Sequence, residues 1–288
     1  MKKRLLSALL CAAMLLLSLP AAFAASDLDG HWAKKYIDYL ADEDIINPSA
    51  TTGKYSPDAK VTRAEFMRYI NRAFHFEETA SITYTDVPKS AWYYETVCIA
   101  QKYGYMNGVG NNKMDPTGTV TREQAATIIG RLYKADPGSV SASSLDFKDK
   151  AKISSWSAGY IKAAVDKGFL AGYSDGTFQP TREVTRGEVA KIIYYYLGTS
   201  LSRAGKAYTG ADLRGDTTNV TISESCTLSD ATIAGDLFIT EGLGTDAVAL
   251  SNVTVEGMII ISGGTVTMTN TTSDHIIVSS SMGRLLQT

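Results

Sequence analysis

The chain has 288 residues, of which 44% are hydrophobic and 20% charged, and its formal net charge is −2 at neutral pH. This length allows one to three domains with an ample core. The near-neutral charge excludes a compositional argument for nucleic acid or an anionic membrane as the partner. Three cysteines and three histidines are too few and too scattered for a disulfide framework or a structural zinc site, and nothing in the sequence indicates a cofactor.

Residues 1–24 are predicted to be a secretory signal peptide. A basic start at residues 1–4 precedes an uncharged apolar run from Leu5 to Leu19, and Ala22-Phe23-Ala24 forms a small-x-small cleavage site. The apolar run is shorter than the roughly 20 residues that span a bilayer. We therefore expect export, cleavage after Ala24 and no membrane insertion of the product, whose net charge becomes −5 once three basic residues are lost.

The middle of the chain contains three copies of one unit. Trp32, Trp92 and Trp156 are separated by 60 and 64 residues, a Thr-Arg pair follows each tryptophan, and a proline stands five residues before each threonine. The same register in three places indicates a repeat architecture. The three pairs are Thr62-Arg63, Thr121-Arg122 and Thr185-Arg186.

Each copy predicts a helix, a loop and a second helix. Apolar residues five and eight positions after each tryptophan form one helical stripe. The threonine of each Thr-Arg pair, with Glu or Gln three residues later, forms a capping box that begins the second helix. One pair of helices cannot bury the stripe of that second helix, so we expect the copies to share a core. The second-helix stripes are Phe66, Ile70, Ala73, Phe74; Ala125, Ile129, Leu132, Tyr133; and Val189, Ile193, Tyr196, Leu197.

Helix formation does not explain the arginines Arg63, Arg122 and Arg186. Each stands in the first turn of a predicted helix, where the helix dipole favours an acidic residue. One interpretation is a salt bridge to a nearby aspartate. The other is an anion site, in which a guanidinium beside a helix N-terminus grips a carboxylate or phosphate with two parallel hydrogen bonds. The repeated tryptophans likewise allow core packing or stacking against a sugar ring.

Each copy begins and ends with a recognisable motif. The motif pairs are Asp27-Leu28-Asp29-Gly30-His31-Trp32-Ala33 with Val61-Thr62-Arg63-Ala64-Glu65-Phe66, Tyr84-Thr85-Asp86-Val87 with Val120-Thr121-Arg122-Glu123, and Phe147-Lys148-Asp149 with Val184-Thr185-Arg186-Gly187-Glu188. These motifs closely resemble the two ends of a repeat of the S-layer homology family, and the resemblance covers about residues 26 to 200. The resemblance implies a three-lobed, all-α assembly with pseudo-threefold symmetry. Such modules tether exported proteins noncovalently to secondary cell-wall polysaccharide, often through a pyruvylated amino-sugar end group that lies in grooves between the lobes.

The resemblance also implies the residues that form these grooves. Arginines are expected to hold the carboxylate, aspartates to orient the arginine or bond sugar hydroxyls, tryptophans to wall the groove, and glycines to let a ligand approach bare backbone. In that order they are Arg63, Arg122, Arg186; Asp27, Asp86, Asp149; Trp32, Trp92, Trp156; and Gly108, Gly172. The first copy departs from the pattern with Pro48 in place of glycine, and the groove with Gly172 and Arg186 is the strongest candidate.

The C-terminal part predicts a different structure. Residues 201–216 are rich in Ser, Gly and Lys and are predicted to be a linker. From Thr217 onward, short runs rich in Thr, Val and Ile begin at Asp230, Asn252 and Asn270, at steps of 22 and 18 residues. This period favours a parallel β-solenoid of about three coils, with a β-sandwich of hairpins as the alternative. The predicted organisation is signal peptide 1–24, repeats 25–80, 81–140 and 141–200, linker 201–216 and solenoid 217–288.

Two classes of function follow. In the first, the protein is a noncatalytic component of the cell wall or S-layer surface. Its helical part is the anchor, and its β tail has a display role or assembles with other copies or surface-layer proteins. In the second, the same anchor carries a carbohydrate-active enzyme built on the solenoid. A glycosidase needs paired carboxylates, yet the acidic residues after Thr217 do not line up in successive coils, and Arg284 is the only Lys or Arg there. We therefore expect no enzyme activity.

Overall fold

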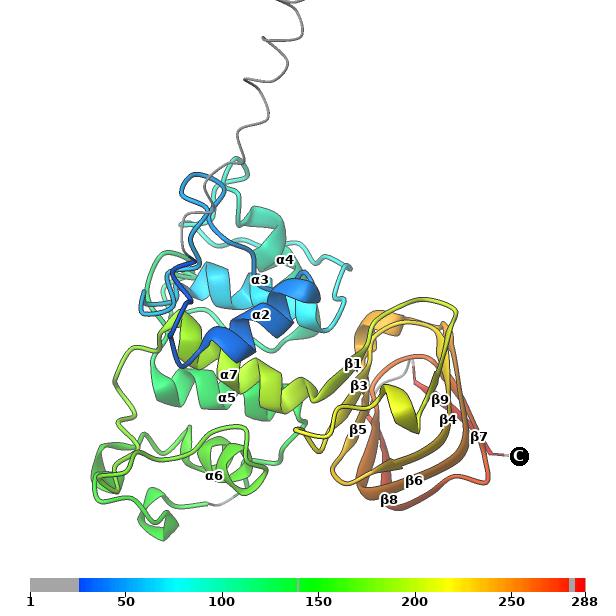
Figure 1. Ribbon diagram of the computed structural model, residues 1–288. Helices are drawn as coiled ribbons and strands as arrows, with labels where there is room; N and C mark the ends of the chain where they lie inside the picture. The colour runs from blue at the N-terminus through cyan, green and yellow to red at the C-terminus, as the bar shows by residue number, and fades with distance from the viewer. Residues whose placement is uncertain (1–25, 139, 280–282, 288) are drawn as a thin grey trace, which may run out of the picture.

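The structure is a computed structural model that describes residues 26–138, 140–279 and 283–287. The predicted signal peptide lies outside these residues. Figure 1 shows a helical part that lies beside a coiled β part. This arrangement confirms the predicted fold class, an all-α repeat module followed by a parallel β-solenoid.

The helical part has two main helices per repeat, as predicted. Each second helix begins with a complete capping box at Thr62, Thr121 or Thr185, which satisfies backbone donors that the first helical turn leaves open. The helices are α2 (Lys34–Asp42), α3 (Arg63–Ala73), α4 (Tyr94–Tyr103), α5 (Arg122–Leu132), α6 (Ala158–Asp166) and α7 (Arg186–Leu197), and the short 3-10 segments are η2 (Ala142–Ser144), η3 (Lys150–Lys152), η4 (Gly210–Asp212) and η5 (Glu241–Leu243).

Neighbouring repeats exchange helices to form the lobes. Helix α4 packs on α3, α6 packs on α5, and α2 at the start of the module packs on α7 at its end. Each lobe therefore combines the second helix of one repeat with the first helix of the next. The contact between α2 and α7 closes the three lobes into a ring.

Three valines mark the centre of this ring. The backbone N–H of Val61 donates to the Val184 carbonyl at 3.1 Å, Val184 donates to Val120 at 2.9 Å, and Val120 donates to Val61 at 3.1 Å. The cycle of hydrogen bonds joins the strand-like residues before α3, α5 and α7. It gives the module its pseudo-threefold symmetry.

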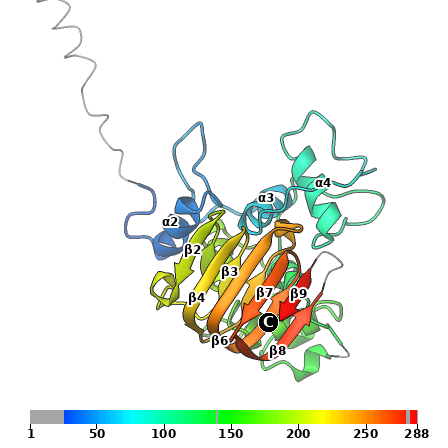
Figure 2. The same cartoon turned by 90° about the vertical axis from the view of Figure 1, so that its right-hand side faces the viewer.

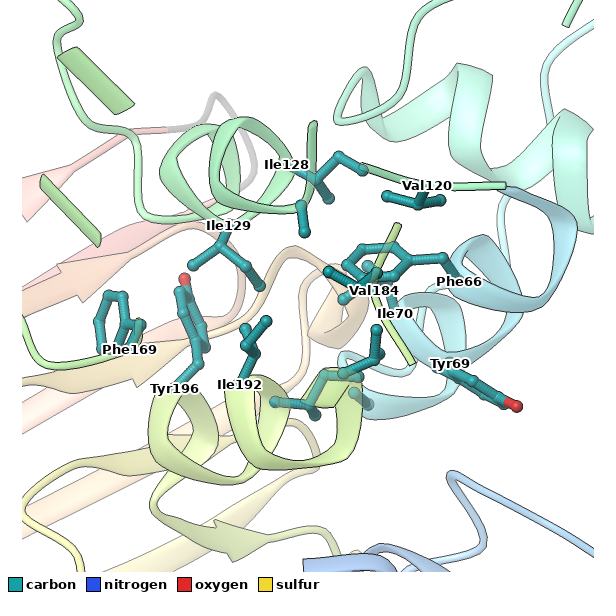
Figure 3. Packing of buried hydrophobic residues seen from close by; sticks show 14 of the residues in the cluster. Phe66, Tyr69, Ile70, Val120, Ile128, Ile129, Phe169, Val184, Ile192 and Tyr196 are labelled. Carbon is teal, nitrogen blue, oxygen red and sulfur yellow. The ribbon is translucent and has the colours of Figure 1, made fainter. Parts of the chain in front are cut away.

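One hydrophobic core joins all three repeats. Figure 3 shows Phe66 and Ile70 of α3 beside Val120 and Val184 at the centre of the ring. All four side chains are fully buried. The core continues through the predicted stripes of the second helices, which confirms that the copies fold around a shared interior.

All strand pairs of the β part are parallel, and the strands stack into about four coils. Figure 2 shows the strands running alongside one another. The parallel pairing confirms the solenoid and excludes the hairpin sandwich. The strands are β1 (Thr199–Leu201), β2 (Lys206–Thr209), β3 (Val220–Ile222), β4 (Cys226–Ile233), β5 (Leu237–Ile239), β6 (Ala247–Ile261), β7 (Thr265–Thr269), β8 (Thr272–Val278) and β9 (Arg284–Gln287).

The predicted linker at 201–216 is wrong, because these residues belong to the first coil. Strand β1 pairs with β3, and β2 pairs with β4. Tyr208 is buried and stands in register with Leu228, which itself pairs with Leu250. The first coil offers few apolar side chains to this column, so its sequence resembles a polar linker. The solenoid consequently begins at Thr199 and has one coil more than predicted.

The helical and β parts share a packed junction. Phe238 of β5 and Ile260 of β6 point outward from the solenoid into the core of the helical module, and burial of such a side chain contributes about 1.5–3 kcal/mol. The Asp236 carboxylate is 2% exposed and accepts hydrogen bonds from Lys167 at 2.8 Å and from the Tyr133 hydroxyl at 3.2 Å. The junction fixes the solenoid on the module.

Candidate functional site

Arg63 and Arg122 are buried and clamp a loop of the following repeat. Arg63 donates from Nε to the Met114 carbonyl at 2.8 Å and from Nη2 to the Asn107 carbonyl at 2.6 Å. Arg122 repeats this geometry in the third repeat, at 2.8 and 2.9 Å. The edge formed by Nε and Nη2 is therefore occupied by backbone, and this edge is not available for two parallel hydrogen bonds to a carboxylate.

Arg186 differs from the other two arginines. Its Nη1 donates to the Tyr55 carbonyl at 3.0 Å, and its Nη2 forms an ion pair with the Glu65 carboxylate. Its Nε is buried without a hydrogen-bond partner among the described residues. The salt-bridge interpretation thus holds for this copy, but the partner is the glutamate of a capping box and not an aspartate.

Each of the three aspartates accepts hydrogen bonds from backbone N–H groups, and none of them lines a groove described below. Asp86 accepts hydrogen bonds from the N–H of Met114 at 2.9 Å and of the next residue at 2.8 Å. Asp27 and Asp149 make the same bonds in their own repeats. Although burial opposes the shift, these N–H donors lower the pKa of Asp27 and Asp86. Because Met114 also accepts from Arg63, the aspartate orients the arginine through this shared residue.

The glycines are required by packing inside their own repeats. A Cβ atom on Gly172 would lie 2.7 Å from Cε1 of Phe147, and one on Gly108 would lie 2.5 Å from the Lys113 carbonyl oxygen and 2.9 Å from Cε1 of Tyr84. All three distances are too short for a side chain. Packing alone therefore requires glycine at both positions, and their expected role in ligand approach stays a prediction.

The three tryptophans are exposed, so the core-packing interpretation is wrong. Trp32 and Trp156 are 51% exposed and Trp92 is 56% exposed. Large exposed aromatic side chains on a soluble module commonly mark a binding surface. Each of the three lies at the edge of a different groove, and we name the grooves after them.

The Trp156 groove has a volume of about 470 Å³ and lies where all three repeats meet. The first repeat contributes an arginine, the second a loop and one face of α5, and the third the tryptophan. The lining includes two arginines and no acidic residue. Its polar and aromatic members are Arg63, Asn107, Gln124, Thr127, Arg131 and Trp156.

The Trp32 groove is the equivalent site one repeat further on, with a volume of about 570 Å³. The guanidinium carbon of Arg122 lies 4.4 Å from the centroid of the Tyr173 ring. Glu188 is the one acidic residue of the lining, and its carboxylate accepts a hydrogen bond from Tyr173 at 3.0 Å and is paired with Arg182. Lys191 completes the cationic wall.

The pairing of Gly172 with Arg186 in one groove is wrong. Gly172 lies in the Trp32 groove with Arg122, and Gly108 lies in the Trp156 groove with Arg63. The reason is that Arg63 and Arg122 each donate hydrogen bonds to a loop of the next repeat. Arg186 stands in the last repeat and donates to the first one.

The Trp92 groove, of about 480 Å³, has a different character. The guanidinium carbon of Arg68 lies 4.8 Å from the centroid of the Trp92 ring, so a cation of the protein covers the indole. Four carboxylates and two guanidinium groups line this groove. They are Glu43, Asp44, Glu77 and Glu95, with Arg68 and Arg72.

Several groove residues were missed by the sequence analysis. The ninth residue after each helix-starting arginine lines a groove, as Arg72, Arg131 or Tyr195. The residue three positions after the capping Glu or Gln also lines a groove and differs in charge among the repeats, as Arg68, Thr127 or Lys191. Because the copies diverge at these positions, a search for identical residues passed over them, while a comparison by helical face would have found them.

The buried arginines carry an electrostatic requirement. Burial lowers the pKa of Arg63 and of Arg122, because a charged group is less stable away from water. Among the described residues neither arginine has an ion-pair partner, and Nη1 of each donates no hydrogen bond. An anion in each groove would compensate the charge of the arginine there.

The described part of the chain shows no group of three or more His, Cys, Asp or Glu side chains that could hold a metal ion. Within the same residues, none of the helices has the length and apolarity needed to cross a bilayer.

Comparison with known proteins decides the family. The S-layer homology domain family matches residues 26–67, 83–126 and 146–190. The chain contains three S-layer homology domains. These matches coincide with the three repeats, which confirms the resemblance found in the sequence.

The relatives include both enzymes and surface proteins. An amylopullulanase of Thermoanaerobacterium thermosulfurigenes is 33% identical over 178 residues, which are 61% of this chain and 10% of the relative. A cellulosome-anchoring protein of Acetivibrio thermocellus is 35% identical over 111 residues, or 38% and 24% of the two chains. A surface-layer 125 kDa protein of Lysinibacillus sphaericus is 26% identical over 165 residues, or 56% and 14%. The chain spans less than a quarter of the length of each.

S-layer homology domains anchor surface proteins to the cell wall by binding its polysaccharide. The similarity to the relatives rests on this common module, since an amylopullulanase and a surface-layer protein otherwise differ in function. The module therefore indicates where a protein is held and does not indicate what the rest of it does.

Proposed function

We propose that this protein is an exported surface component held noncovalently on secondary cell-wall polysaccharide by its three S-layer homology domains. The pyruvylated amino-sugar end group of the polymer binds in the Trp156 and Trp32 grooves. The observation that carries the proposal is the repeated combination of an exposed tryptophan with cationic side chains in these two grooves. The signal peptide, residues 1–24, directs export.

The chemistry of each groove suits an acidic sugar. In the Trp156 groove, Nη1 of Arg63 and the guanidinium of Arg131 face a carboxylate, and the indole covers the flat face of the ring. In the Trp32 groove, Arg122 and Lys191 take the place of the two arginines. Two sites on one rigid body increase the apparent affinity for a polymer through effective concentration.

The Trp92 groove does not take part in this binding. Its four carboxylates oppose an anion, and Arg68 already occupies the face of the indole. The three grooves of one symmetric module therefore have unequal roles.

Sedimentation with purified cell walls tests the proposal. Because the tryptophans are exposed, changing Trp32 and Trp156 to alanine leaves the core intact, whereas removing the buried arginines would also disturb the fold. We expect the double variant to remain in the supernatant and Trp92→Ala, the matched control, to sediment with the walls. Walls that lack pyruvylation should retain neither the wild-type protein nor the control. Equal retention on walls with and without pyruvylation would contradict the proposed ligand.

We further propose that the solenoid is noncatalytic and has a structural or display role. A carbohydrate-active solenoid is the competing function, and the enzymes among the relatives motivate it. Incubation of the purified protein with wall and plant polysaccharides should release no reducing sugar. Release that increases with time and protein concentration would replace the display role by catalysis.

A further inference from the structure

The junction between the module and the solenoid contains a pocket of about 480 Å³ that the proposed grooves do not include. Aromatic rings form its walls. Phe76 and Tyr103 stack with their centroids 3.9 Å apart and their planes 9° apart, and Tyr196 stacks on Phe238 at 4.8 Å and 19°. Phe76, Tyr103 and Tyr196 belong to the helical module, and Phe238 belongs to the solenoid.

Polar groups of both parts surround the rings. The module contributes Arg131 and Lys134, and the solenoid contributes Thr240, Glu241 and Ser262. Lys134 and Glu241 lie 3.7 Å apart across the junction. A pocket of flat aromatic walls with several hydroxyl, amino and carboxylate groups suits a ligand that is rich in hydroxyls and has flat apolar faces, which describes a sugar.

Arg131 connects this pocket to the Trp156 groove, because its side chain lines both. It is anchored by a 3.4 Å hydrogen bond from Nη1 to the Tyr105 carbonyl. A polymer whose end unit lies in the Trp156 groove can therefore pass Arg131 and continue along the same side of α5 into the junction.

We propose that the junction pocket is a second saccharide subsite, which binds sugar units that follow the end group held in the Trp156 groove. The inference rests on the proposed function, since it takes the same polymer as the ligand. It assigns the solenoid a direct part in wall binding, through Glu241, Thr240 and Ser262. The solenoid is then part of the anchor as well as the portion that the anchor holds.

Calorimetric titration of the full chain with two probes tests this subsite. The first probe is the pyruvylated amino-sugar end unit alone. The second is an oligosaccharide of several repeat units that carries the same end unit, prepared from purified wall polysaccharide. We expect the wild-type protein to bind the oligosaccharide about tenfold or more tightly than the single unit, because additional aromatic surface and hydrogen bonds become engaged.

Three variants separate the subsite from the groove. Tyr103→Ala should weaken oligosaccharide binding by about tenfold through loss of one wall, and Glu241→Gln and Lys134→Ala should weaken it by about three- to tenfold each, the range of one hydrogen bond. Binding of the single end unit should not change. Tyr94→Ala on the same helix, α4, is the matched control for Tyr103→Ala, and Glu241→Gln keeps the size of the side chain, so it remains informative if the alanine variant unfolds.

The outcomes distinguish the two proposals. If the end unit and the oligosaccharide bind with equal affinity, or if all three variants bind both probes as the wild type does, the junction subsite is wrong and the groove proposal stands. If the wild-type protein binds neither probe, both proposals are wrong.

Discussion

The Trp156 and Trp92 grooves each form between a tryptophan and the same face of a second helix, yet they differ in charge and in the environment of the indole. In the Trp156 groove the indole is at the edge of a site lined by two arginines and no acidic residue. In the Trp92 groove Arg68 stacks over the indole, and four carboxylates are present. The family fold therefore fixes where a groove forms, while a few side chains that differ among the repeats decide whether it attracts an acidic ligand.

The largest expected difference between the two grooves is the contribution of their arginines to the free energy of unfolding. Arg63→Ala removes the donors of the Met114 and Asn107 carbonyls and should lower the free energy of unfolding by about 2–4 kcal/mol, since each unsatisfied buried group costs about 1–3 kcal/mol. Arg68→Ala in the Trp92 groove loses a cation–π contact with an exposed indole and should cost less than about 1 kcal/mol. Urea denaturation measures both. Equal losses would show that the two arginines have equivalent structural roles.

An introduced acidic residue should make the Trp156 groove resemble the Trp92 groove. Gln124 lines the Trp156 groove and closes the capping box of α5, a role that glutamate fills at Glu65 and Glu188. Gln124→Glu should therefore keep the fold. It should weaken binding of the acidic end unit by about three- to tenfold, because a carboxylate in the groove repels the ligand.

The third repeat provides the control for this substitution. Glu188 is paired with Arg182. In the second repeat the position of Arg182 is taken by Gly118, so a carboxylate introduced at residue 124 has no such partner. Glu188→Gln should change binding less than Gln124→Glu does. If Gln124→Glu binds the end unit as tightly as the wild type, charge does not distinguish the grooves.

Acid should loosen the loops that the arginines clamp. The folded-state pKa of Asp86 is below its ordinary value, so its contribution to stability is present above about pH 4 and is lost as the pH falls through the lower, folded-state value. We expect Asp86→Asn to be less stable than the wild type at pH 7 and to lose less further stability on acidification. Thermal unfolding measured between pH 7 and pH 3 checks this. Parallel curves for the two proteins would show that Asp86 does not contribute to the pH dependence.

The smallest effect is expected in the Trp92 groove itself. Glu95→Gln removes one of four carboxylates around an indole that Arg68 still covers, so wall binding should change by less than about twofold. Sedimentation over a range of wall concentrations measures it. A strong gain would indicate that the groove is closed to the ligand by this single charge.

The sequence predicted the helices better than it predicted the grooves. Capping boxes at Thr62, Thr121 and Thr185 and the stripes behind them are local signals, and the structure confirms them. The exchange of helices between repeats is not local, because α2 meets α7 across more than 140 residues of chain. Without that exchange, Gly172 was assigned to the wrong arginine.

The errors at single residues have a common physical cause. The role of Arg63 depends on the Met114 and Asn107 carbonyls in another repeat, and sequence spacing gives no information on such backbone partners. The first solenoid coil was missed because Tyr208 stands among polar residues that face solvent. The pocket at the junction was beyond prediction, since it exists only where Phe238 and Tyr196 are brought together from the two parts.

The most direct test of the account is the affinity of three proteins for the same pyruvylated walls, measured by sedimentation. The proteins are the wild type, the variant with both Trp32→Ala and Trp156→Ala, and Trp92→Ala. We predict that the double variant loses at least about tenfold in affinity and that Trp92→Ala stays within about twofold of the wild type. If Trp92→Ala releases the protein from the walls while the double variant remains bound, the assignment of the grooves is contradicted.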